Sequence, residues 1–346
     1  MVLHERTRHW IRRAAQAAAC ATAMAAGAGA ASLVDLQQAR AAQPVRVVTE
    51  APVFAPTPRE EPLFYRAPEE PDPTLPEVNW SESATVIGGT PHRLIHFTFD
   101  DGPSRNTTPR LLEELDRLGI KATFFITTGR MATPGQRARE ERAILANIAE
   151  RGHRIGNHTI THRQLPLLTP AEVLEEVRGA GDLIEEVTGL RPTMMRPPGG
   201  SRSARIDAAL QSLGLSQLMW NLGSGDSQVR DSEQVLTTFR RVLRRREREH
   251  GERGGIVLLH DTHAWSVDAF PKIVDFLRSE NCKLLERGEE LFDIVDTPDA
   301  FFVHRDDVPG DATMAEPPAD WLAHRQSQLR QSTRQRCGLL AANQAD

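Results

Sequence analysis

The sequence predicts an α/β fold in which about seven parallel strands and their crossover helices form a (β/α) barrel. Short β-rich runs alternate with stretches whose apolar residues recur at helical spacing, which is typical of parallel strands joined by right-handed crossovers. Polar residues follow several of these runs. A barrel assembles its site from the carboxyl ends of many strands, whereas a doubly wound sheet uses one crevice and fewer strands, so we favour the barrel.

The candidate strands are residues 94–99, 122–127, 154–157, 193–196, 216–222, 255–259 and 283–285. Between them, apolar residues three or four apart predict helices over 111–118, 173–187, 235–242 and 267–277. The polar residues at or just beyond different strand ends are Asp100, His158, Arg196, Asp226 and His260. We expect these side chains to share one edge of the fold.

The first residues are typical of a secretory signal. Arginines precede an alanine-rich stretch over residues 14–33, and small-residue triplets ending at Ala30 and Ala41 are candidate cleavage sites. An uncleaved anchor is the alternative, but alanine is only weakly lipophilic. Residues 1–41 are therefore predicted to be a signal peptide, which places the protein in the secreted or periplasmic space of the cell envelope. No other stretch is apolar enough to predict a transmembrane segment.

Residues 42–85 are rich in proline and predict a semi-rigid linker. The folded domain is predicted over 86–296. A C-terminal extension over 297–346 has no assigned function, with a short helix expected over 320–335. The net charge of −5 gives no general reason to bind nucleic acid, and the basic run over 240–248 is interpreted as the solvated end of a helix. Cys282 and Cys337 remain after signal removal, and the sequence leaves open whether they form a disulfide.

Two histidines and a carboxylate are typical ligands of a catalytic zinc ion that keeps one position open. His158 and His162 follow a predicted strand, and one helical turn would bring them within about 6 Å of each other. His92 and His96 have the same spacing but lead into a strand, which would hold them about 13 Å apart. The first pair is therefore the candidate.

Asp100 and Asp101 close the first strand. Neighbours in a regular strand face opposite ways, so both carboxylates reach one site only if the strand stops there. Gly102 and Pro103 favour such a stop, although a turn or a helix cap is the alternative interpretation.

Two further segments carry candidate chemistry. Arg196 can clamp a carboxylate and keep it ionised, and Gly199 can offer a bare backbone N–H to a developing oxyanion. His260 can donate a proton to a leaving amine once a carboxylate orients it. Asp226 is the candidate for that carboxylate, and adjacent Asp261 is the alternative.

Together these segments resemble the polysaccharide deacetylase family of the nodulation-factor deacetylase type, also called carbohydrate esterase family four. Residues 98–102 read TFDDG, 158–162 read HTITH, 196–200 read RPPGG, and 256–260 form a strand ending in the LxH pattern. The fourth motif departs, because residues 223–227 read GSGDS in place of DxxDW. Only Asp226 survives there, and an aromatic wall of the sugar groove is lost. Gly199 stands where many members carry tyrosine.

The resemblance implies an irregular (β/α) barrel. It implies a divalent metal ion, usually Zn²⁺, held by Asp101, His158 and His162. It further implies Asp100 as general base, Arg196 as its partner, and His260 as general acid supported by Asp226.

The implied function is removal of N-acetyl groups from an extracellular or cell-envelope polysaccharide of the N-acetylglucosamine type, releasing acetate. An O-acetyl esterase or small-amide hydrolase on the same fold, or a non-catalytic carbohydrate-binding relative, remains the alternative. The identity of the glycan is left open.

Overall fold

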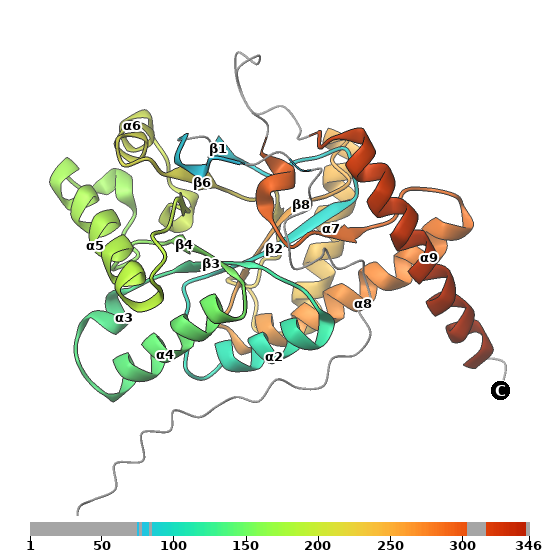
Figure 1. Cartoon of the computed structure of the whole chain (residues 1–346), viewed down its shortest axis with the longest axis horizontal. Helices are drawn as coiled ribbons and strands as arrows, with labels where there is room; N and C mark the ends of the chain where they lie inside the picture. Colours follow the sequence, from blue (N-terminus) through green and yellow to red (C-terminus); the bar gives the residue numbers. More distant parts are fainter. Residues whose placement is uncertain (1–74, 76–77, 83–84, 303–315, 344–346) are drawn as a thin grey trace, which may run out of the picture. The chain divides into compact units, whose positions relative to one another are not determined.

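Figure 1 shows the computed structural model of the chain, which describes residue 75 and residues 78–82, 85–302 and 316–343. The predicted signal peptide and nearly all of the predicted linker lie outside these residues. In the described ranges, no helix combines the length and the apolar character that crossing a bilayer requires.

A parallel sheet forms the centre of the fold. Its strands follow the order β1 (Thr85–Val86), β6 (Ser216–Leu218), β5 (Met194–Met195), β4 (Arg154–Asn157), β3 (Thr123–Ile126), β2 (Leu94–Asp100), β8 (Gly255–His260) and β7 (Leu222–Gly223). A ninth strand, β9 (Asp293–Ile294), also pairs with β2. Every pairing between named strands is parallel. The predicted α/β fold is confirmed as an irregular half-barrel.

Eight α-helices are described: α2 (Thr108–Leu118), α3 (Gly129–Ala132), α4 (Gln136–Glu150), α5 (Pro170–Thr188), α6 (Ala204–Ser212), α7 (Ser232–His250), α8 (Ala264–Glu286) and α9 (Ala319–Asn343). The helical stretches expected from sequence lie inside α2, α5, α7 and α8. In α5 the local reason is complete: Thr169 and Glu172 form a capping box, and Gly189 ends the helix in a left-handed conformation.

Two strand predictions are wrong. Residues 216–222 do not form one strand but divide into β6 and β7. Residues 283–285 lie inside α8, where Leu284 is buried on the same side as Leu277. A short apolar run does not distinguish a strand from a buried helix, because both bury such residues. The last strand is instead β9, which is too short to show a period.

Strand β2 lies deep in the core, and all of its residues are buried. Phe99 stacks on Phe124 of β3 at 5.3 Å, and Phe97 meets Phe270 of α8 edge to face at 5.0 Å. Because both faces of a parallel sheet are covered, the strand is mostly apolar, and its buried polar residues His96 and Thr98 are hydrogen-bonded. This rigid packing therefore fixes the position of Asp100, the last residue of the strand, at the edge of the sheet.

The polar segments flanking the predicted domain also pack against it. Trp80, in the short helix η1 (Trp80–Glu82), is buried, and its Nε1 donates to Asp299 Oδ1 at 2.7 Å. Asp299 belongs to η4 (Pro298–Phe301), which lies beyond residue 296. The described ends of the predicted linker and extension thus belong to the same packed body.

Helix α9 contains the short helix expected over 320–335, and an ion pair and a disulfide are among the links that hold it. Arg325 reaches the buried carboxylate of Asp293 with Nε at 2.5 Å and Nη2 at 2.9 Å. The disulfide that the sequence left open joins Cys282 of α8 to Cys337 of α9, with 5.9 Å between the Cα atoms. These links cross-connect the extension to α8 and β9.

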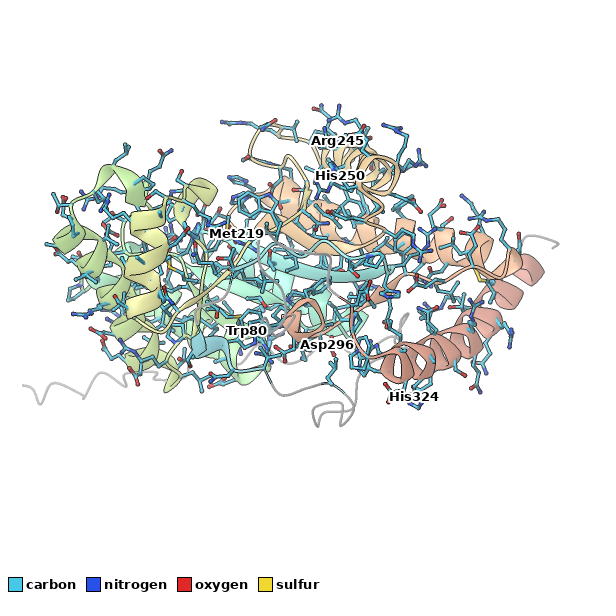
Figure 2. All side chains as sticks on the ribbon, turned by 90° about the horizontal axis from the view of Figure 1, so that it is seen from above. Trp80, Met219, Arg245, His250, Asp296 and His324 are labelled. Carbon is cyan, nitrogen blue, oxygen red and sulfur yellow. A yellow bond between two sulfur atoms is a disulfide. The ribbon has the colours of Figure 1, made fainter. Side chains whose placement is uncertain are left out.

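The basic run lies at the C-terminal end of α7, as the sequence predicted. Figure 2 shows Arg245 and His250 pointing outward from this helix, and both are exposed. Its apolar residues Val235, Phe239 and Leu243 face the core.

Candidate functional site

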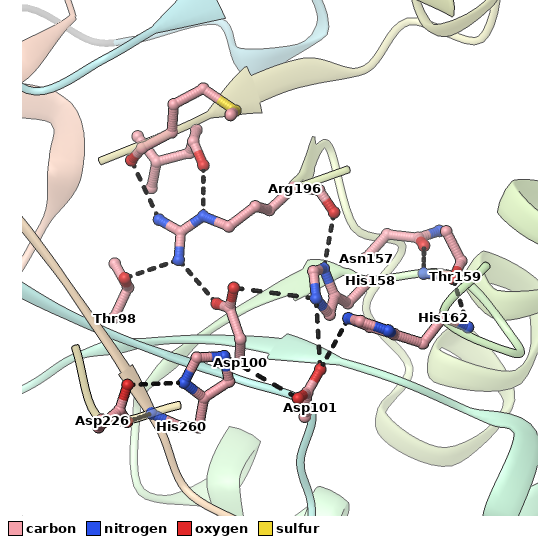
Figure 3. A network of polar contacts seen from close by, with 12 residues as sticks. Thr98, Asp100, Asp101, Asn157, His158, Thr159, His162, Arg196, Asp226 and His260 are labelled. Carbon is pink, nitrogen blue, oxygen red and sulfur yellow. Dashed lines mark hydrogen bonds and ion pairs between the residues drawn. The ribbon is translucent and has the colours of Figure 1, made fainter. Parts of the chain in front are cut away.

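The predicted site residues meet at the carboxyl edge of the sheet (Figure 3). Asp100 and His260 end the paired strands β2 and β8 and lie opposite each other in register. His158 and Arg196 directly follow β4 and β5. Strands that run parallel deliver their final residues to one edge, so residues far apart in sequence converge there.

The backbone breaks its strand alternation at Asp101. This residue has a φ of 73°, a left-handed conformation that side chains rarely adopt. The turn directs the Asp101 carboxylate toward the imidazoles on the side where Asp100 also lies (Figure 3). Gly102 makes the turn possible, because a Cβ there would lie 2.1 Å from Oδ2 of buried Asp261.

Asp101 and the two histidines form a candidate metal site. Asp101 Oδ1 lies 3.4 Å from His158 Nε2 and 3.2 Å from His162 Nε2. Ligand atoms about 2.0 to 2.1 Å from a tetrahedral zinc ion are separated by about 3.3 Å, so the spacing fits this ion. Asp101 Oδ1 is also buried, with no hydrogen-bond partner of normal geometry among the described residues. Burial opposes ionisation of Asp101, but the nearby imidazoles, above all His158, hold the pKa of its carboxyl well below the usual range.

A backbone contact fixes the orientation of His158. Its Nδ1 lies 2.7 Å from the carbonyl oxygen of Arg196. A carbonyl only accepts, so Nδ1 carries the proton and Nε2 presents its lone pair to the candidate site. The short loop at the end of β5 thus orients a ligand from β4.

The pair His158 and His162 does not lie on a helical turn, and that expectation is wrong. The segment is a loop in which Thr159 and His162 have φ values of 69° and 60°, yet the two rings lie 5.0 Å apart. Asn157 Oδ1 accepts from the Thr159 N–H at 2.8 Å, and Thr159 Oγ1 accepts from the His162 N–H at 3.1 Å. These side-chain contacts shape the loop where helical bonds are missing.

Glu176 of α5 holds the far side of this loop. Its carboxylate accepts from the Ile160 N–H at 3.0 Å and from the Thr161 N–H at 2.8 Å. His162 itself is half-exposed, and partial burial lowers the pKa of its imidazole. A neutral imidazole is the form that binds a metal ion.

Arg196 and Asp100 form a buried ion pair. Arg196 Nη1 lies 2.7 Å from Asp100 Oδ1 and also donates to Thr98 Oγ1 at 2.8 Å. Its other nitrogens donate to the carbonyl oxygens of Leu218 and Met219. A buried charge pair of this kind is stable only when its remaining donors are satisfied, and here they are. The pair fixes one carboxylate oxygen of Asp100 and leaves Oδ2 toward His158 Nε2, at 3.8 Å.

His260 is bound to Asp226. Its Nδ1 lies 3.0 Å from Asp226 Oδ1, and its Nε2 faces Asp101 Oδ2 at 3.9 Å. Burial lowers the pKa of His260, but the hydrogen bond and charge of Asp226, with Asp100 and Asp101, outweigh it and raise the pKa to about 9. The imidazole is therefore protonated near neutral pH.

Asp261, the alternative partner, does not fill that role. Its Oδ2 accepts from Thr108 Oγ1 at 2.5 Å, inside the fold. Burial first, and then the charge of Asp101, raise the pKa of Asp261 to about 7.

A second cluster, Asp226, His260 and His263, also has the composition of a metal site. The Asp226 carboxylate, however, accepts from the backbone and Nδ1 of His260 and from Ser266 Oγ, at 2.7, 3.0 and 2.6 Å. Both oxygens of Asp226 already accept hydrogen bonds, so we interpret Asp226 as the hydrogen-bonding partner of His260 and not as a metal ligand.

Gly199 lies at the same edge, in η3 (Pro198–Gly200), with a φ of 62°. The residue is exposed, and no hydrogen bond from its N–H is recorded within the described part of the chain. Its role toward an oxyanion stays a prediction.

Sequence reasoning missed the supporting residues Thr98, Asn157, Glu176 and Ser266. Thr98 stands within the TFDDG segment, but nothing in the sequence signals the other three. Each acts through a neighbour far along the chain or through a loop whose shape is visible only in three dimensions.

Comparison with known proteins supports the class that this fold and site indicate. Residues 87–218 match the family described as polysaccharide deacetylase. The chain is 31% identical over 192 residues to the putative polysaccharide deacetylase YheN of Bacillus subtilis, covering 54% of this chain and 64% of the relative. It is 28% identical over 216 residues to the peptidoglycan-N-acetylglucosamine deacetylase PgdA of Listeria monocytogenes, covering 60% and 42%.

A chitin deacetylase of Colletotrichum lindemuthianum is 28% identical over 209 residues, covering 60% of this chain and 83% of that protein. The crystal structure of the Bc1960 peptidoglycan N-acetylglucosamine deacetylase superposes with a TM-score of 0.51 at 24% identity, covering 65% and 97% of the two chains. This likeness confirms the fold. The chain spans less than two thirds of the length of the first curated relatives that it matches.

Proposed function

We propose that this protein is a metal-dependent hydrolase that removes N-acetyl groups from a cell-envelope or extracellular polysaccharide and releases acetate. One observation carries the proposal: a carboxylate and two imidazoles at metal-ligand spacing lie beside a second carboxylate, which is paired with Arg196, and a histidine whose Nδ1 is held by Asp226. The relatives named as peptidoglycan and chitin deacetylases support the same reaction and an acetylated amino sugar as substrate.

The proposed cofactor is Zn²⁺, held by Asp101, His158 and His162. When bound, a divalent ion at this place polarises a carbonyl oxygen and makes water more acidic. The chain supplies the remaining steps through its own side chains.

Asp100 is the proposed general base. Arg196 occupies Oδ1 and keeps the carboxylate ionised, so Oδ2 is left to take the proton of the attacking water. Loss of either partner would leave an unpaired charge inside the fold.

His260 is the proposed general acid. Asp226 holds Nδ1, so the Nε2 proton points to the side where Asp101 lies. A positioned proton is needed there because an amine is a poor leaving group unless it is protonated. The Gly199 N–H is the proposed donor to the oxyanion.

The altered fourth motif does not argue for a non-catalytic relative. The one residue of that motif that matches, Asp226, makes the contacts that His260 requires. An O-acetyl esterase depends less on a general acid, because an alkoxide leaves more easily than an amine. Activity of His260→Ala on esters but not on amides would identify that alternative.

We infer a secreted or periplasmic location. The amino-terminal signal motif and the disulfide between Cys282 and Cys337 support it, since such bonds persist mainly in oxidising compartments.

The experiment that tests the function is acetate release from a panel of glycans: peptidoglycan, chitin oligosaccharides, an acetylated exopolysaccharide and acetylated xylan. We expect release from the glycans that carry N-acetylglucosamine and none from acetylated xylan. Release from xylan alone would replace the amidase by an esterase, and binding without release would leave a carbohydrate-binding protein.

A further inference from the structure

Arg230 is an exposed arginine at the carboxyl edge of the sheet and has no acidic partner recorded among the described residues, unlike several arginines in neighbouring segments. Arg105, Arg130, Arg163 and Arg202, all in segments that follow strands at this edge, have acidic partners, namely Glu140, Glu141, Glu172 with Glu176, and Asp207. Arg230 follows β7 at the same edge and is exposed. No ion pair to Arg230 is recorded within residues 78–82, 85–302 and 316–343.

Arg230 is nevertheless held in place. Its guanidinium carbon lies 5.7 Å from the ring centre of Trp265, a distance typical of a cation–π contact. Trp265 Nε1 donates to the carbonyl oxygen of Asp226 at 2.7 Å, so this ring is tied to the loop that also carries the partner of His260. The Trp265 ring is thus fixed by its hydrogen bond and supports the Arg230 guanidinium, which has no acidic partner recorded in the described part of the chain.

A stack of rings connects this arginine to the catalytic histidine. His263 lies 5.2 Å from His260 between ring centres and stacks on Trp265 at 4.7 Å, with 18° between the planes. The faces of His263 and Trp265 are therefore turned toward each other, and Arg230 lies over the ring of Trp265. The rings of His263 and Trp265 therefore lie between His260, the proposed proton donor, and the positive charge of Arg230.

The nearby carboxylates do not neutralise this cation. Asp226 is buried and engaged by His260 and Ser266. Asp231, the next residue, accepts from the Gln234 N–H at 2.9 Å as the cap of α7. A planar guanidinium with free donors matches the geometry of a carboxylate.

We propose that Arg230, positioned by Trp265, forms an anion subsite that binds the carboxylate of an acidic glycan, next to the sugar whose acetamido group reacts. This inference rests on the proposed function and narrows its substrate: a polymer in which carboxylate-bearing and acetylated amino sugars are neighbours is preferred over neutral chitin. The aromatic wall lost from the fourth motif is thus replaced by a charge.

The test compares two probes, a peptide-free tetrasaccharide of alternating N-acetylglucosamine and N-acetylmuramic acid, and neutral chitotetraose. Both the dissociation constant, by calorimetry, and acetate release are measured with the zinc-loaded full chain. Arg230→Gln removes the charge and Arg230→Lys keeps it. Arg241→Gln is the matched control, because Arg241 is an exposed arginine on α7 that no proposed role involves.

For Arg230→Gln we expect binding of the acidic probe to weaken about twofold to fivefold, the upper part of the range of an exposed charge pair, with no measurable change for chitotetraose. Arg230→Lys should recover part of the loss, and Arg241→Gln should match the wild type. Equal effects on both probes, or none, overturn the subsite. If no acetate is released but the binding difference holds, the hydrolase proposal fails and the subsite stands.

Discussion

Arg196 Nη1 and Asp100 Oδ1 lie 2.7 Å apart in a place where both side chains are buried. This ion pair gives the two oxygens of the Asp100 carboxylate different surroundings. Oδ1 is bound to the guanidinium, whereas Oδ2 faces the side where the metal-ligand candidates lie. Two aspartates adjacent in sequence thereby have different environments, one paired with a buried cation and the other with imidazoles.

Asp100→Asn tests this separation. The change keeps the volume but removes the base and the charge that Arg196 needs. Acetate release should fall by about two to four orders of magnitude, with bound metal unchanged, as measured by elemental analysis. Undiminished release would contradict the role of Asp100.

His158→Ala should abolish metal retention. The imidazole is a predicted ligand whose orientation is fixed by the Arg196 carbonyl, so no other side chain replaces it. Metal content after dialysis is the measurement, and His250→Ala, an exposed histidine at the end of α7, is the control. Equal metal content in the two variants would exclude His158 as a ligand.

We predict that turnover falls at alkaline pH, where His260 loses the proton that it would donate as general acid. Because the pKa of His260 is raised from 6.5 to about 9, the imidazole stays protonated through neutral pH and kcat should fall as the pH rises through about 9. Asp226→Asn removes the main raising charge and should move this limb to lower pH. By the same linkage, the stability that follows from the raised pKa of His260 is complete below pH 6.5, while Asp226 is ionised, and is lost as the pH rises through about 9. A pH profile of Asp226→Asn identical to that of the wild type would contradict the assignment.

The disulfide should stabilise the fold measurably. It closes a loop with a sequence separation of 55 residues. In the chain-entropy treatment such a loop contributes about 4 kcal/mol, an upper value because native strain and residual structure reduce it. Cys282→Ser with Cys337→Ser should lower the denaturation midpoint, and reductant should affect only the wild type. A midpoint insensitive to reductant would show that the bond is not formed.

The sequence predicts the rigid parts of the molecule well. Strand β2 and helices α2, α5, α7 and α8 are recognised because a buried strand is rich in apolar residues and a helix repeats its apolar face. Residues 283–285 fail for the same reason, since a short apolar run fits either state. Strands of two residues, such as β1 and β9, carry no period at all.

The candidate ligands and the Arg196 segment are visible from sequence because strand ends meet at one edge. The shape of the loops is not. The left-handed turn at Asp101 and the non-helical loop around His162 depend on contacts from Asp261, Asn157 and Glu176, which are distant or unremarkable in the sequence. The contact between Arg230 and Trp265 likewise cannot be read from the sequence, because the two residues come from different segments of the chain.

The most direct test of the central claim measures bound metal and acetate release on the same samples. The protein is stripped with a chelator and then titrated with Zn²⁺. We predict that release of acetate from an N-acetylglucosamine glycan is lost on stripping and returns in proportion to bound zinc, reaching its full value at one ion per chain. Full acetate release from the metal-free protein would contradict the account.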